Sequence, residues 1–168
     1  MARALGFYEG PLREAIHRWK YQEKTYLTSF FGLKMTEGLH RYWDPKSFDL
    51  LIPVPLHPQR LRKRGFNQAL LLVKELSRRT GIPYQKRILQ KKKLTIPQVN
   101  LSGVEREKGV KGSFHVQGGE GLRGKGVLLV DDVYTTGATV NECSKVLLSV
   151  GVKRVDVLTL AHAVKTSS

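Results

Sequence analysis

The sequence has little cysteine: Cys143 is the only one among 168 residues. One cysteine can form neither an internal disulfide nor a cysteine-based zinc site. No apolar run approaches the roughly 20 residues that a helix needs to cross a bilayer. Residues 1–10 also lack an apolar core of signal-peptide length. These absences predict a cytoplasmic protein without a membrane span.

Acidic side chains are scarce as well. There are 14 Asp and Glu residues against 29 Lys and Arg residues, which gives a formal net charge of +15 on a chain of 19.0 kDa. The length fits about one domain, and a hydrophobic content of 40% suffices for a folded core. A charge this large predicts anionic partners. The charge alone does not distinguish between nucleic acid, a membrane surface and small phosphorylated ligands as partners.

Most of the excess charge lies in the middle of the chain. Residues 49–115 carry fifteen basic and four acidic side chains, a net charge of +11. Two basic runs, residues 60–64 and 91–93, flank one predicted helix. Each run alone is compatible with a solvated basic face, but together they favour an anion-binding surface.

Predicted strands and helices alternate along most of the sequence. We expect buried strands at residues 48–52, 126–131 and 154–161, and short strands at 88–89 and 113–116. We expect helices at residues 27–42, 67–79 and 138–150, and another that begins near Pro11. This order predicts an α/β fold with a mostly parallel central sheet flanked by helices. Ligands of such sheets bind at the carboxyl ends of the strands, here residues 53–57 and 131–139.

The helix patterns also predict which side chains face the core. The expected apolar side of the helix at residues 27–42 consists of Phe30, Phe31, Met35 and Leu39. The expected inner stripe of the helix at residues 67–79 consists of Ala69, Leu70, Val73 and Leu76. Cys143 lies on the inner side of its helix and is expected to be a small core residue.

The motif with the most chemical content spans residues 127–139 and reads VLLVDDVYTTGAT. An apolar strand delivers two carboxylates, Asp131 and Asp132, to the edge of the sheet. The turn that follows leads into a helix N-terminus, where unpaired N–H groups and the helix dipole favour a phosphate. The residues expected to hold a 5′-phosphate are Thr135, Thr136, Gly137, Ala138 and Thr139. The alternative is an incidental pair of acids before a helix.

This stretch resembles the ribose-phosphate fingerprint of type I phosphoribosyltransferases, in the required strand–loop–helix context. The resemblance implies a type I phosphoribosyltransferase-like fold with a small N-terminal helical hood, residues 1–47, and a core at residues 48–168. A second glycine-rich stretch, residues 119–126, is similar to a phosphate-binding P-loop. It lacks the final Ser or Thr and precedes a strand, so we expect a connecting turn there.

Other segments are similar to the ComF (competence protein F) family. They are residues 51–69 (LIPVPLHPQRLRKRGFNQA), 8–13 (YEGPLR), 19–21 (WKY) and 112–114, with the spacing of Thr95, Gln98, Leu101 and Arg106. Members of that family usually begin with a four-cysteine zinc module, which this sequence lacks. A shortened chain and a naturally short member both remain open. Gly109 also stands where the family has Asn.

The resemblance implies that phosphoribosyl pyrophosphate binds together with Mg²⁺. Asp131 and Asp132 would hold the ribose hydroxyls, and one of them would support the cation that develops during transfer. The residues implied for pyrophosphate are Pro55, Leu56, His57, Arg60 and Arg64. No protein side chain is expected to ligate the metal directly, because pyrophosphate and water would carry Mg²⁺.

The long polar segment at residues 91–111 is expected to be a flexible lid over the site, with Thr95, Gln98 and Arg106 as its functional members. The alternative is a disordered basic linker. Related lids often act near a subunit boundary, which leaves a homodimer open.

Three functions remain open at this stage. The first is an active phosphoribosyltransferase whose acceptor is unknown. The second is a non-catalytic protein that binds phosphoribosyl pyrophosphate or a nucleotide. The third is an accessory factor in DNA uptake, whose basic segments at residues 60–64 and 91–93 bind single-stranded DNA. Glutamine-dependent transfer would need a glutaminase nucleophile and domain, and the sequence contains neither.

Overall fold

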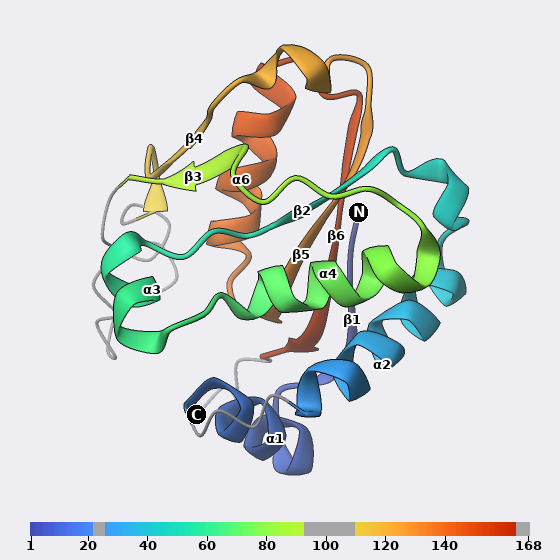
Figure 1. The fold of residues 1–168 in the computed structure, drawn as a ribbon, viewed down its shortest axis with the longest axis vertical. Coiled ribbons are helices and arrows are strands. Elements are labelled where there is room, and N and C mark those ends of the chain that lie inside the picture. Colours follow the sequence, from blue (N-terminus) through green and yellow to red (C-terminus); the bar gives the residue numbers. More distant parts are fainter. Residues whose placement is uncertain (22–25, 93–109, 164–168) are drawn as a thin grey trace.

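The computed structural model describes residues 1–21, 26–92 and 110–163 (Figure 1). Its central sheet contains four strands in the order β1-β6-β5-β2, and every neighbouring pair is parallel. These strands are β1 (Ala2–Phe7), β2 (Leu50–Pro53), β5 (Gly126–Tyr134) and β6 (Arg154–His162). A separate antiparallel pair consists of β3 (Leu89–Lys91) and β4 (Phe114–Val116). The parallel central sheet confirms the predicted fold class.

Helices cover both faces of the sheet, as Figure 1 shows. They are α1 (Gly10–Tyr21), α2 (Tyr26–Tyr42), α3 (Pro58–Arg64), α4 (Gln68–Thr80) and α6 (Ala138–Ser149). Apolar side chains of α2 and α4 pack on one face, and those of α6 pack on the other. In the part of the chain that the structure describes, no helix has the length and apolarity needed to cross a membrane.

The predicted helices α2, α4 and α6 are present within a residue or so of their expected bounds. The side chain of Asn67 caps the start of α4, and Gly81, with a φ of 76°, ends it. Two predicted core residues are wrong. Phe31 is buried, but Phe30 is 53% exposed, because it lies at the border of the apolar stripe of α2. Leu70 of α4 is only half-buried, and Leu72 is buried instead.

Two elements were not predicted. β1 lies at the edge of the sheet, and its residues are exposed or half-buried, so its sequence carries no apolar alternation. It is nevertheless part of the sheet, through pairing with β6. α3 buries none of its residues and therefore has no apolar period. In the sequence it is visible only as a basic run.

The glycine-rich stretch is a connecting segment, as predicted. Residues 119–122 form a short 3₁₀ helix between β4 and β5, and Leu122 is its buried residue. β5 is longer than expected and continues to Tyr134. The residue pairs Val133–Ala161 and Tyr134–His162 extend its pairing with β6 beyond the two acids.

Candidate functional site

The site is built at the carboxyl ends of β2 and β5. Pro53 pairs with Val130, and the N–H of Val54 donates to the carbonyl oxygen of Val130 at 2.9 Å. The loop after β2 therefore starts beside the two acids of β5. Figure 1 shows α1 below this edge of the sheet, where β6 ends.

Asp131 and Asp132 are adjacent on β5 but have different neighbours. The backbone N–H of Asp132 donates to Oδ1 of Asp131 at 2.9 Å. Burial, followed by the charge of Asp132, raises the pKa of Asp131 to about 8, while Lys20 acts in the opposite direction. Lys91 and Cys143 are close enough to interact electrostatically with Asp131. Asp131 is thus the desolvated member of the pair.

Asp132 is ion-paired with Lys20 of α1 through Oδ2 and Nζ. Both side chains are largely buried, with exposed fractions of 13% for Asp132 and 16% for Lys20. Lys20 is a site residue that the sequence analysis did not identify. The only signal for it is its position in the segment WKY, which resembles the ComF family.

The turn between β5 and α6 holds the residues expected to bind a phosphate. Gly137 is the N-cap of α6, has a φ of 79°, and offers no side chain to the amides of the first helical turn. Thr136 Oγ1 accepts weakly from the N–H of Ala138, at 3.4 Å. Thr135 is exposed, and Thr139 is half-buried in the first turn of the helix. The structure therefore gathers these five residues around one helix N-terminus.

The loop after β2 contains Pro55, Leu56 and His57, all half-buried. His57 is the N-cap of α3, because its Nδ1 accepts from the N–H of Gln59 at 3.2 Å. In a neutral imidazole, an Nδ1 that accepts leaves the proton on Nε2. His57 is therefore a polar capping residue of the turn before α3, and its Nε2–H is the remaining donor of the ring.

The two basic residues expected near pyrophosphate have different surroundings. Arg64 donates to Gln68 Oε1 at 2.8 Å and to the Tyr21 hydroxyl at 3.3 Å, and its guanidinium lies over the Tyr21 ring. Arg60 is close to Lys91: burial first, and repulsion from Arg60 second, lower the pKa of Lys91. Arg60 therefore faces the Asp131 side of the site, while Arg64 is joined to α1.

Gln68, the first residue of α4, is a second site residue that the sequence did not reveal. It is 2% exposed, and its Nε2 has no hydrogen-bond partner among the described residues. A buried donor of this kind is costly unless a further group accepts from it. The expected lid residues, Thr95, Gln98 and Arg106, lie outside the described residues.

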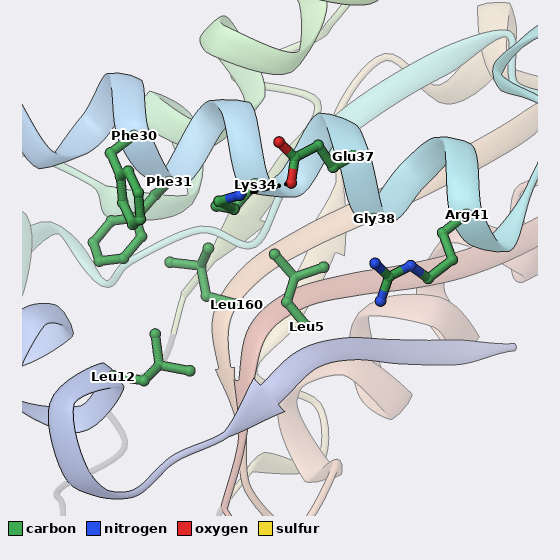
Figure 2. A pocket seen from close by; sticks show the side chains of 9 residues that line it. All are labelled: Leu5, Leu12, Phe30, Phe31, Lys34, Glu37, Gly38, Arg41 and Leu160. Carbon is green, nitrogen blue, oxygen red and sulfur yellow. Dashed lines mark hydrogen bonds and ion pairs between the residues drawn. The ribbon is translucent and has the colours of Figure 1, made fainter.

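A separate cavity of about 340 Å³ lies between α2 and the edge of the sheet (Figure 2). Its lining is partly apolar, and Figure 2 shows Leu12 and Leu160 below Phe30 and Phe31 of α2, with Leu5 below Gly38. Lys34 and Glu37, paired at 2.9 Å, and Arg41 add charges along α2. Neither acid of β5 lines this cavity.

Curated relatives cover nearly the whole chain. Competence protein F of Haemophilus influenzae is 35% identical over 95% of this chain and 71% of its own length. DNA utilization protein YhgH of Escherichia coli is 32% identical over 92% of this chain and 69% of its own length. Competence protein ComFC of Streptococcus pneumoniae is 30% identical, with coverages of 95% and 67%.

Solved structures share the fold at low identity. A purine phosphoribosyltransferase from Pyrococcus horikoshii has a TM-score of 0.50 and 22% identity, over 82% of this chain and 73% of its own. A glutamine phosphoribosylpyrophosphate amidotransferase from B. subtilis has a TM-score of 0.51 and 21% identity. This chain covers only 26% of that enzyme. These likenesses show a type I phosphoribosyltransferase fold.

Residues 67–167 match the phosphoribosyl transferase domain family. The match includes the acid pair, the turn that follows it and all of α6. Together with the relatives named above, it shows that the chain belongs to the phosphoribosyl transferase domain family and to its competence protein F group.

Proposed function

We propose that the chain binds phosphoribosyl pyrophosphate with Mg²⁺ and transfers its phosphoribosyl group to an acceptor, with release of pyrophosphate. One observation carries this proposal. Asp131 and Asp132 lie near the carboxyl end of β5, which passes through a Thr-Thr-Gly turn into α6, beside the loop after β2. This arrangement suits a ligand that has a sugar diol next to a 5′-phosphate.

The 5′-phosphate would lie at the start of α6. Gly137, the N-cap, supplies no side chain to the amides of the first turn, and the positive end of the helix dipole favours an anion there. Thr135, Thr136 and Thr139 would supply hydroxyl donors. Gly137 would let the phosphate oxygens approach the backbone closely.

Pyrophosphate would lie on the loop after β2. Pro55 and Leu56 shape the loop, and the proton on Nε2 of His57 supplies a donor. Arg60 and Arg64 would contribute positive charge to this end of the site. Because Arg64 is already bonded to Gln68 and Tyr21, it acts from a fixed position.

The residues present fit a magnesium ion that arrives with its ligand. Among the described residues, no group of three or more His, Cys, Asp and Glu side chains surrounds a common point. Mg²⁺ normally keeps several waters and binds phosphate oxygens. Pyrophosphate and water would therefore carry the ion, with no protein side chain as a direct ligand. When bound, the ion would neutralise charge on the leaving pyrophosphate.

The chain's own contribution to transfer is position and charge. The bond between the anomeric carbon and the pyrophosphate oxygen breaks, both electrons leave with pyrophosphate, and positive charge develops on the ribose ring. An ionised carboxylate beside the ring would stabilise that charge. The acceptor then forms the new bond at the anomeric carbon and loses its proton.

Calorimetry with phosphoribosyl pyrophosphate and Mg²⁺ tests the binding site. We expect wild-type binding, and a loss of at least about tenfold in affinity for Asp131→Asn/Asp132→Asn. Glu37→Gln is the matched control, because it removes an exposed carboxylate that pairs with Lys34 on α2. Absence of wild-type binding would overturn the proposed site. A screen of bases and amines for pyrophosphate release then tests catalysis and identifies the acceptor class.

The names of the relatives favour a second candidate, an accessory role in DNA uptake. Two relatives are named competence proteins and another a DNA utilization protein. Arg62 and Lys63 of α3 are exposed and could contact the phosphates of single-stranded DNA. This role is compatible with phosphoribosyl pyrophosphate binding with or without transfer.

Salt-dependent DNA binding tests the second candidate. We expect Arg62→Gln/Lys63→Gln to weaken binding of a single-stranded oligonucleotide and to reduce the logarithmic salt slope by about one to two. Lys145→Gln/Lys153→Gln removes the same charge from other exposed positions and serves as the control. Equal effects of both pairs would contradict a DNA site on α3.

A further inference from the structure

The last turn of α1 is held in place on both sides of Lys20. Trp19 is fully buried, and its indole N–H donates to Thr28 Oγ1 at 2.9 Å. Its ring packs against Phe31 of α2 with a centroid separation of 5.1 Å. Ile16, one turn earlier, is also fully buried. The backbone that carries Lys20 is therefore anchored in the core.

Tyr21, on the other side of Lys20, contacts the pyrophosphate side of the site. Its hydroxyl accepts from Arg64 at 3.3 Å, and the Arg64 guanidinium lies 5.2 Å from the ring centroid. Arg64 in turn donates to Gln68. The end of α1 thus spans the site from the acids of β5 to the start of α4.

Lys20 is ion-paired with one member of the acid pair, and Lys91 lies near the other. Lys20 of α1 forms an ion pair with Asp132 that is largely removed from water. Lys91 of β3 is near enough to Asp131, to Cys143 of α6 and to Arg60 of α3 for their charges to affect its pKa. Coulomb attraction is strong at a site of such low exposure, so the Lys20 ammonium holds the Asp132 carboxylate in one orientation.

We propose that Lys20 is a positioning residue of the phosphoribosyl site, which holds the Asp132 carboxylate in its orientation for the ribose. This role rests on the proposed function. A carboxylate at this position would repel a ligand that carries a phosphate and a pyrophosphate. The Lys20 ammonium offsets that charge, while Asp132 keeps carboxylate lone pairs for ribose hydroxyl groups.

The test compares Lys20→Met, Lys20→Gln and Lys20→Arg with the wild type. Arg18→Met is the matched control, because it removes a cation from the same helix and breaks only an exposed ion pair with Glu14. The first readout is the backbone amide NMR signal of Asp132 at one fixed pH, assigned with Asp132→Asn. The second is affinity for phosphoribosyl pyrophosphate with Mg²⁺, measured by calorimetry at the same pH.

We expect Lys20→Met and Lys20→Gln to shift the amide signal of Asp132, because the ion pair that holds its side chain is lost. The affinity for phosphoribosyl pyrophosphate falls about tenfold in both variants. Lys20→Arg restores most of the affinity, and Arg18→Met changes neither the signal nor the affinity. Lys20→Gln keeps a polar group at the position, so at least one neutral variant remains folded for measurement.

Different results would overturn the role of Lys20 and the proposed function. Wild-type affinity in Lys20→Met and Lys20→Gln would overturn the role of Lys20 alone. A failure of Lys20→Arg to restore affinity would do the same. Absence of binding by the wild type would overturn the proposed function and this role with it.

Discussion

The side-chain amide of Asn67 joins the start of α4 to the loop after β2. Its Nδ2 donates to the carbonyl oxygen of Val54 at 3.0 Å, and its Oδ1 accepts from the N–H of Ala69 at 3.0 Å. Val54 in turn is bonded to Val130, the residue before the acid pair. The Asn67 amide therefore holds the start of α4 to the loop, and the N–H of Val54 holds that loop beside the acids.

Two replacements of Asn67 distinguish its role as the cap of α4 from its role in positioning the loop after β2. Asn67→Ala loses both bonds and should lower the free energy of unfolding by about 1 to 2 kcal/mol. Asn67→Asp keeps the cap but loses the donor to Val54, so we expect a smaller loss of stability with weaker phosphoribosyl pyrophosphate binding. Urea unfolding and calorimetry measure the two effects.

Asp44→Ala is the control for the Asn67 variants. Asp44 caps the short 3₁₀ helix at Pro45–Ser47 by accepting from the N–H of Lys46 at 3.0 Å. Loss of this cap should lower the free energy of unfolding without changing the affinity for phosphoribosyl pyrophosphate. Equal affinities for wild type and Asn67→Asp would show that the bond to Val54 does not position the loop.

Gly137 is required for two reasons. Its φ of 79° is unfavourable for any residue with a Cβ, and a Cβ there would overlap the Tyr134 hydroxyl group. We expect Gly137→Ala to destabilise the protein by about 1 to 3 kcal/mol and to weaken phosphoribosyl pyrophosphate binding. Thermal unfolding and calorimetry measure both.

Two further variants separate the contributions of backbone strain and of overlap with Tyr134 to the loss of stability in Gly137→Ala. Gly65→Ala introduces a Cβ at a φ of 83° with nothing within 4 Å, so it measures backbone strain alone. Tyr134→Phe removes the hydroxyl and should restore part of the stability of Gly137→Ala. If Gly137→Ala lowers the free energy of unfolding by no more than Gly65→Ala does, the overlap with Tyr134 does not destabilise the protein.

Asp131 should make stability depend on pH. Its pKa is raised to about 8 in the folded protein from an ordinary value near 4, so the folded state binds more protons than the unfolded state between these values. Stability therefore falls as pH rises through this window, with a limiting slope of about 1.4 kcal/mol per pH unit. Asp131→Asn keeps an acceptor for the Asp132 amide, so in this variant stability should fall less steeply as pH rises.

Urea unfolding at several pH values checks this prediction. The stability gained by Asp131→Asn should grow from about pH 4 to about pH 8 and then level off. Glu37→Gln, which neutralises an exposed carboxylate, should follow the wild-type curve. Parallel curves for wild type and Asp131→Asn would contradict a raised pKa at Asp131.

The elements predicted from sequence are those with strong periodicity and clear ends. β5, α4 and α6 have buried apolar stripes, and Gly81 marks the end of α4. β1 and α3 were missed because neither shows a buried stripe. The pairing of β1 with β6 and the capping of α3 by His57 define them instead.

Some residues of the candidate site could likewise be predicted from sequence, and others could not. Residues contiguous in the motif at residues 127–139 could be named from sequence, because strand, turn and helix start bring them together. Lys20 and Gln68 could not, since their roles depend on where α1 and α4 lie relative to β5. Contacts between segments so far apart in the chain follow from tertiary packing, which no local pattern encodes.

Cys143 provides a reporter of unfolding and of ligand binding. It is fully buried on α6, and burial and the nearby Asp131 raise the pKa of its thiol well above the usual range. Because a protonated, buried thiol is a poor nucleophile, we expect negligible labelling by a disulfide reagent in the native protein. Complete labelling in concentrated guanidinium chloride is the control, and a single cysteine makes the signal unambiguous. Ligand that binds only the folded state should slow labelling further, by about a hundredfold at a concentration one hundred times its Kd. Rapid labelling under native conditions would contradict the buried position of Cys143.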